Sequence, residues 1–148
     1  METMQWDKTY SVGIAEIDRL QQNYVMLLNK LIELRNEGAE IKDISDALAD
    51  IVEFVRHYCN TEEKMLLRHH YPELGLHKLE HKLLLKNSMK FRRWFADDPD
   101  SLSDDVVNFF KEWGDAHFTV SDFRYGAFVR LQEFLGRYSQ IDRRIRPV

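Results

Sequence analysis

The sequence predicts an all-α protein, an up-down antiparallel four-helix bundle with an extended N-terminal leader and a short C-terminal helix. Four long segments repeat apolar residues at intervals of three and four, which is the period of an amphipathic helix. No segment shows the clean alternation with a period of two that indicates a strand. The connections between the segments are short, which favours antiparallel neighbours in a bundle.

The first two helices are predicted from their apolar spacing and from the residues at their ends. In the first, the apolar series begins at Ile17 and stops near Gly38, a residue type that caps many helix C-termini. The second begins at Asp43 or Ser45, either of which is a candidate N-cap, and ends before Pro72. The leader precedes the first of these helices and lies outside the bundle.

The third and fourth helices are separated by a turn with strong sequence signals. The third starts after Pro72 and continues to Phe95, and the Asp-Asp-Pro-Asp turn at 97–100 ends it. The fourth begins near Ser103, and a shorter helical segment follows at about 125–138. We expect one domain over the whole chain, divided into a bundle at about 15–122, a C-terminal segment at 123–138 and a basic tail at 139–148.

Composition excludes several classes of protein. The length of 148 residues suits one domain, and the net charge of −4 argues against nucleic acid as the main partner. No apolar run approaches the roughly 20 residues of a membrane span, and the N-terminus lacks the features of a secretory signal. The single cysteine, Cys59, cannot form an intrachain disulfide. We therefore expect a cytoplasmic protein whose basic tail is solvated.

Several polar side chains fall on helix faces that should be apolar. His77 and His81 are four residues apart and so project from one side of the third helix, and His117 lies four residues after Trp113 on the apolar face of the fourth. A buried carboxylate is costly without a partner. The full set comprises Gln21, Tyr58, Glu62, His77, His81, His117 and Asp122.

Each of these residues also has an ordinary interpretation. The histidine pair occurs often on surfaces, Glu62 belongs to an acidic pair that is typical of a solvated face, His117 could be a core histidine, and Asp122 could cap a helix. Their joint placement on inner faces favours a metal site instead. Imidazole and carboxylate groups are ligands of transition metals, and bundle cores are where such sites are built.

At these residues the sequence resembles the hemerythrin family, especially bacterial hemerythrins, over about residues 6–130. The resemblance rests on the spacing of motifs in the leader, in the second and third helices and in the fourth helix. These motifs are Trp6-Asp7, Tyr10–Ile14, Ile17-Asp18, Glu62-Glu63, Tyr71-Pro72, His77, His81, Trp113, His117 and Asp122.

The resemblance implies a four-helix bundle that holds two non-haem irons, bridged by two carboxylates and an oxo or hydroxo group, with reversible dioxygen binding at one iron. By position, His77, His81 and His117 would bind one iron, and Glu62 and Asp122 would be the bridging carboxylates. Iron is therefore the expected cofactor, and manganese or zinc also suits a nitrogen and oxygen ligand set.

The sequence departs from the family at the second iron, where dioxygen binds. Two histidines are expected there, and the chain has Gln21 and Tyr58 instead. His57 would reach the site only through a π-bulge, because on a regular helix it points about 100° away from Tyr58. Tyr58 could ligate as a phenolate and Gln21 through its amide oxygen, or the two could simply hydrogen-bond. One or two metal ions per chain are consistent with these residues.

Three functions follow from this interpretation. The first is a carrier, store or sensor that binds dioxygen or a related small ligand such as nitric oxide, and the overall motif favours it over an enzyme. The second is a mononuclear or asymmetric di-iron enzyme acting on peroxide, superoxide or ferrous iron, for which an open coordination position would suffice. The third is a degenerate family member with a structural metal that acts through its surface. The sequence identifies no protein partner.

Overall fold

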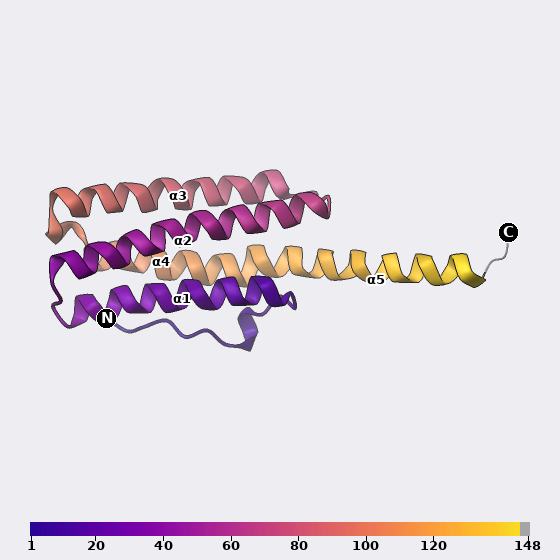
Figure 1. The fold of residues 1–148 in the computed structure, drawn as a ribbon, viewed down its shortest axis with the longest axis horizontal. Coiled ribbons are helices and arrows are strands. Elements are labelled where there is room, and N and C mark those ends of the chain that lie inside the picture. Colours follow the sequence, from indigo (N-terminus) through magenta and orange to yellow (C-terminus); the bar gives the residue numbers. More distant parts are fainter. Residues whose placement is uncertain (146–148) are drawn as a thin grey trace.

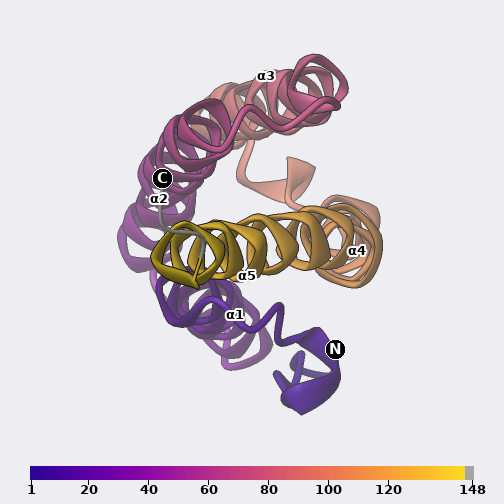
Figure 2. The ribbon, with the colours of Figure 1, turned by 90° about the vertical axis from the view of Figure 1, so that its right-hand side faces the viewer.

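Four helices run antiparallel along one axis in the computed structural model of the chain (Figure 1). It describes the backbone of residues 1–145 and the side chains of residues 1–137. Viewed along the axis, the helices follow one another in the order α3, α2, α1 and α4 (Figure 2). Their bounds are α1 (Ala15–Asn36), α2 (Ile41–Arg68), α3 (Leu74–Asp97) and α4 (Asp104–Ala116).

The predicted four-helix bundle is confirmed, and residues 1–145 contain no strand. Two short 3₁₀ turns flank the helices, η1 (Lys8–Tyr10) in the leader and η2 (Pro99–Ser101) between α3 and α4. Within the described part of the chain, every helix is too polar or too short to cross a lipid bilayer.

The ends of α1 and α4 follow from their capping residues, as the sequence predicts. Gly38 adopts a φ of +66°, and the amide of Ala39 donates to the carbonyl of Leu34, as expected for a helix that ends on a left-handed glycine. At the start of α4, the Ser103 hydroxyl accepts a hydrogen bond from the amide of Val106.

The start of α2 differs from the prediction. The helix begins at Ile41 with Glu40 in the N-cap position and no side-chain cap, so neither Asp43 nor Ser45 caps it. Asp43 instead lies in the first turn, where a carboxylate interacts favourably with the positive end of the helix dipole. Because the chain reverses at Gly38, only a few residues separate α1 from α2 and the helix starts early.

The expected break between the fourth helix and the C-terminal segment is absent. A π-helical stretch, η3 (His117–Asp122), joins α4 directly to α5 (Phe123–Ile145). The C-terminal helix is therefore longer than expected and projects beyond the other helices (Figure 1). The predicted basic tail falls partly on α5, but residues 146–148 and all side chains after residue 137 lie outside the described part.

The leader is fastened to the bundle by a carboxylate and by a close backbone contact. Asp18 accepts hydrogen bonds from the amide of Val12 and the hydroxyl of Ser11. Val12 is fully buried and packs directly against Gly126 of α5, where an added Cβ would lie 2.8 Å from both the Val12 Cβ and its carbonyl oxygen. The half-buried Trp6 of the same leader reaches Gln21 of α1 through a hydrogen bond from its indole nitrogen.

Candidate metal centre

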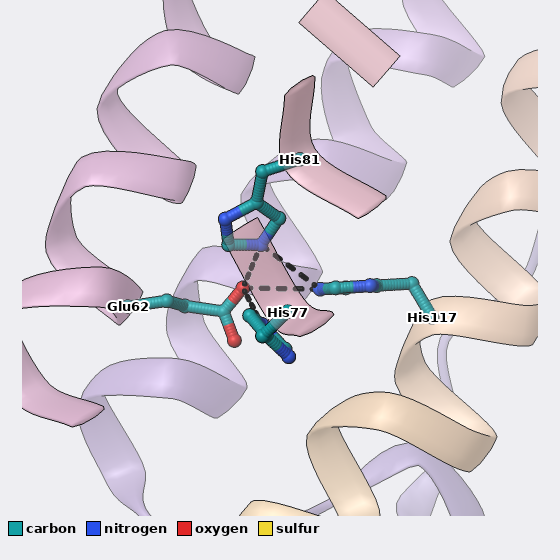
Figure 3. A group of neighbouring side chains, drawn as sticks. All are labelled: Glu62, His77, His81 and His117. Carbon is teal, nitrogen blue, oxygen red and sulfur yellow. Dashed lines mark hydrogen bonds and ion pairs between the residues drawn. The ribbon is translucent and has the colours of Figure 1, made fainter. Parts of the chain in front are cut away.

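One glutamate and three histidines meet at the centre of the bundle (Figure 3). Glu62 comes from α2, His77 and His81 from successive turns of α3, and His117 from the junction of α4 with η3. The Glu62 Oε1 atom lies 3.1 Å from the Nε2 atoms of both His81 and His117, and 3.5 Å from the Nε2 atom of His77. All four side chains are buried, and one ligand atom from each lies within 4.8 Å of the others.

A fifth predicted residue, Asp122, reaches the same site because of the π-helical stretch. The Asp122 Oδ1 atom lies 2.9 Å from His117 Nε2 and 4.0 Å from His77 Nε2. Residues five apart would diverge on a regular α-helix, whereas the wider π turn brings them onto one face. The local distortion of the fourth helix therefore places His117 and Asp122 side by side.

The donor set fits a metal ion. Two buried atoms at the centre, Glu62 Oε2 and His77 Nε2, find no hydrogen-bond partner among the described residues. Buried polar atoms are normally satisfied, and leaving one unpaired costs about 1–3 kcal/mol. Three imidazole nitrogens and two carboxylates would satisfy iron, manganese or zinc.

The buried ionisable groups at the centre shift one another's pKa values. Burial alone would lower the pKa of His117, but the nearby carboxylates of Asp122 and Glu62 hold it well above its ordinary value. Burial opposes ionisation of Glu62, yet the charge of His117 and the hydrogen bonds from His117 and His81 hold its pKa well below normal. Burial and the charge of Glu62 raise the pKa of Asp122 to about 6. A metal ion held by His117 Nε2 would take the place of a proton on that nitrogen.

On the second-metal side, Gln21 and Tyr58 form hydrogen bonds to Asp122. The Tyr58 hydroxyl donates to Asp122 Oδ2 at 2.5 Å, and the Gln21 amide donates to the same oxygen at 3.0 Å. The Trp6 indole in turn donates to Gln21 Oε1 at 3.0 Å. Burial and the charges of Asp122 and Glu62 raise the pKa of Tyr58 well above 10, so its phenol keeps its proton.

The third residue suggested for the second site, His57, is not near it. Its side chain is exposed on α2, next to Phe54, and α2 is a continuous α-helix through this region. No π-bulge turns His57 inward in this structure, and its side chain faces away from the centre of the bundle. The π-helical geometry occurs instead between His117 and Asp122.

Three further residues contact or approach the centre without having been identified from the sequence. The carboxylate of Glu80 lies 3.2 Å from His117 Nδ1 and accepts a hydrogen bond of 2.6 Å from the Ser121 hydroxyl. Tyr125 is fully buried beside His77, with ring centroids 5.4 Å apart. The available signal was their spacing, because Glu80 follows His77 by three residues and Tyr125 follows Asp122 by three.

Comparisons with known proteins agree with the fold and the motifs. The chain is 22% identical over 120 residues to hemerythrin-like proteins of Naegleria gruberi and Naegleria fowleri, covering 81% of this chain and 88% of each relative. A crystal structure of a hemerythrin mutant superposes with a TM-score of 0.80 at 21% identity, covering 86% of this chain and 97% of that one. The chain has a hemerythrin-like fold.

The resemblance that the sequence motifs indicated is thereby confirmed. A second mutant crystal structure superposes with a TM-score of 0.79 at the same identity and coverage. No protein-family model matches the chain. The hemerythrin-like fold and the Glu/His group together identify a candidate metal-binding site, while metal binding by the individual side chains stays a prediction.

Proposed function

We propose that the chain is a hemerythrin-like iron-binding protein that holds one iron ion and binds a small ligand such as dioxygen or nitric oxide. The fold, the convergence of three imidazoles on Glu62, and the unpaired buried atoms support this proposal. The residues that would hold the ion are His77, His81, His117, Glu62 and Asp122.

The observation that carries the single-ion proposal is that the two carboxylate oxygens of Asp122 have different contacts. Its Oδ1 atom faces the histidines and lies 2.9 Å from His117 Nε2. Its Oδ2 atom already accepts from Tyr58 and Gln21. A carboxylate that bridges two metal ions needs one oxygen for each ion. The Asp122 oxygen that would be needed for a second ion already accepts hydrogen bonds from Tyr58 and Gln21.

The chain's own residues also provide a polar surface for a small ligand. When bound, iron supplies Lewis acidity and a coordination position that a small molecule can occupy. Among the described residues, Glu62 Oε2 and the Tyr125 hydroxyl are both buried without a hydrogen-bond partner. Burial and the charges of Asp122 and Glu62 raise the pKa of Tyr125 well above 10, so its hydroxyl remains available as a donor.

The metal site is tested by comparing histidine variants. Iron per chain is measured by elemental analysis after purification from iron-supplemented cells without chelator. We expect His77→Ala and His117→Ala to lose the iron. The matched control is His57→Ala, which removes an exposed histidine and should retain it. Equal iron content in all three variants, or zinc or manganese in place of iron, would contradict the proposal.

The ligand-binding part is tested by spectroscopy of the iron-loaded wild type. Absorption spectra under argon and air, and spectra of the ferrous protein with added nitric oxide, report whether a small ligand enters the site. We expect a spectral change that reverses when the gas is removed. Turnover of the ligand instead of reversible binding would favour the enzyme hypothesis, and no response to either gas would favour a structural metal.

A further inference from the structure

Glu80 is the one carboxylate outside the central group that makes a hydrogen bond with a predicted histidine ligand in the described part of the chain. Its Oε2 atom lies 3.2 Å from the Nδ1 atom of His117. The Nε2 atom of the same imidazole faces the centre, 3.1 Å from Glu62 Oε1 and 2.9 Å from Asp122 Oδ1. His117 thus has one nitrogen toward the site and one toward Glu80.

This arrangement determines which nitrogen of His117 can bind a metal. A histidine ligand binds through an unprotonated nitrogen, so the proton must sit on the other nitrogen of the ring. Because a carboxylate accepts but cannot donate, Glu80 favours the form of His117 with its proton on Nδ1. That form directs the lone pair of Nε2 toward Glu62 and Asp122.

Glu80 is itself held in place from the same helix that carries His117. The Ser121 hydroxyl donates to Glu80 Oε2 at 2.6 Å, the same oxygen that faces His117. Glu80 comes from α3 and Ser121 from η3, so this oxygen joins the two elements that supply the three histidines. A shift of α3 relative to η3 would therefore disturb the ring of His117.

The other two histidines lack such a partner among the described residues. Glu63 Oε2 lies 3.5 Å from His81 Nδ1, but that nitrogen makes no hydrogen bond. The structure gives no carboxylate contact at the outer nitrogen of His77. Glu63 and Glu80 therefore form a natural comparison, because both are partly exposed glutamates beside a histidine of the site and only Glu80 makes the hydrogen bond.

We propose that Glu80, held by Ser121, is the positioning residue that fixes the ring and tautomer of His117 for metal binding. This inference rests on the proposed metal site. Carboxylates that hydrogen-bond to a histidine ligand typically change metal affinity by about 10–100-fold when they are removed. Glu80 does not touch the ion itself, and its effect acts through the orientation and basicity of His117.

The test measures cobalt(II) binding to the metal-free protein in competition with a chromophoric chelator. Glu80→Gln keeps the size of the side chain and removes its charge, and Glu80→Ala also removes the acceptor. We expect cobalt affinity to fall about 10-fold or more in Glu80→Gln, and further in Glu80→Ala. Glu63→Gln is the matched control and should bind cobalt like the wild type.

Two additional readouts separate positioning from general destabilisation. The absorption bands of bound cobalt report its ligand environment and should shift in the Glu80 variants but not in Glu63→Gln. Thermal unfolding of each metal-free variant shows whether the fold is intact. Rescue of affinity by Glu80→Asp, which restores a carboxylate, would support the inference.

The outcomes distinguish this inference from the proposed function. If the wild type binds cobalt and Glu80→Gln matches Glu63→Gln in affinity and spectrum, the positioning role is overturned while the metal site stands. If the wild type binds no cobalt, the proposed metal site fails and the inference fails with it. A Glu80→Gln variant that is weakened only because it unfolds, with an unchanged cobalt spectrum, also overturns the positioning role.

Discussion

Removing the hydroxyl of Tyr58 should measurably destabilise the metal-free protein. The hydroxyl donates to Asp122 Oδ2 at 2.5 Å, and both side chains are buried. Because the pKa of Asp122 is raised only to about 6, its carboxylate is ionised at pH 7.5. A hydrogen bond to a charged group contributes about 1.5–3 kcal/mol, so Tyr58→Phe should lower the free energy of unfolding by about 2 kcal/mol.

The same substitution leaves the packing of the ring in place. Tyr58 stacks on Phe118 with centroids 6.3 Å apart, and a phenylalanine can occupy the same position. In Tyr58→Phe, Asp122 keeps the hydrogen bond from Gln21 at 3.0 Å. The measured loss therefore reports the hydroxyl and its charged acceptor rather than a cavity.

Two further tyrosines provide a graded control. Tyr24 is buried and donates to the neutral carbonyl of Phe110 at 2.8 Å, so Tyr24→Phe should cost about 0.5–1.5 kcal/mol. Tyr10 donates to Asp115 at an exposed position, so Tyr10→Phe should change stability by no more than about 0.5 kcal/mol.

The assay is urea unfolding of the metal-free proteins at pH 7.5, followed by circular dichroism. The expected order of destabilisation is Tyr58→Phe, then Tyr24→Phe, then Tyr10→Phe. A loss in Tyr58→Phe no greater than that in Tyr10→Phe would refute the claim that Asp122 is held as a buried anion by Tyr58.

Three other changes have defined outcomes. Combining Gln21→His with Tyr58→His should release Asp122 and raise the metal content toward two ions per chain by elemental analysis, and an unchanged content would refute this. The hydrogen bond from His117 lowers the pKa of Glu80 from its ordinary value of 4.5 to about 2. Ionised Glu80 therefore stabilises the folded state fully above pH 4.5. This stabilisation is lost as the pH falls toward 2. The difference in unfolding free energy between the wild type and Glu80→Gln should therefore shrink between pH 6 and pH 3, and a growing difference would contradict the reasoning. Gly126→Ala should lower the free energy of unfolding in urea by about 1–3 kcal/mol, because its Cβ would clash with Val12 of the leader. The control is Gly75→Ala, whose Cβ meets open space and should not destabilise the fold. Equal effects of the two substitutions would argue against the close contact.

The main helices could be predicted because apolar periodicity depends only on local sequence. The series beginning at Ile17, the glycine at 38 and the serine at 103 each act within a few residues, and the structure places them as expected. The start of α2 could not be predicted in the same way. Asp43 and Ser45 resemble caps, but the tight reversal at Gly38 decides where the helix begins.

The sequence predicts the histidines of the site better than it predicts the residues around them. His77 and His81 share a helix face by simple spacing, so their convergence follows from the predicted fold. The alignment of His117 with Asp122 depends on a π-helical turn, which apolar periodicity alone does not predict. The spacing of Glu80 three residues after His77 places it near the site, but its contact with His117 joins two helices and spacing within one helix does not reveal it.

The hydrogen bonds that replace the second-metal ligands depend on tertiary placement. The sequence allowed Gln21 and Tyr58 either to ligate a metal or to hydrogen-bond. In the structure both donate to Asp122, and Trp6 of the leader donates to Gln21. The leader also packs closely against Gly126, a contact that no helical periodicity reveals.

The most direct test of the central claim is the number of metal ions bound per wild-type chain. The protein is purified from iron-supplemented cells without chelator, and iron, zinc and manganese are measured against the protein concentration. We predict one iron ion per chain, held on the histidine side of Asp122. Two ions per chain would contradict it, because Asp122 Oδ2 would then have to exchange its hydrogen bonds from Tyr58 and Gln21 for a second metal.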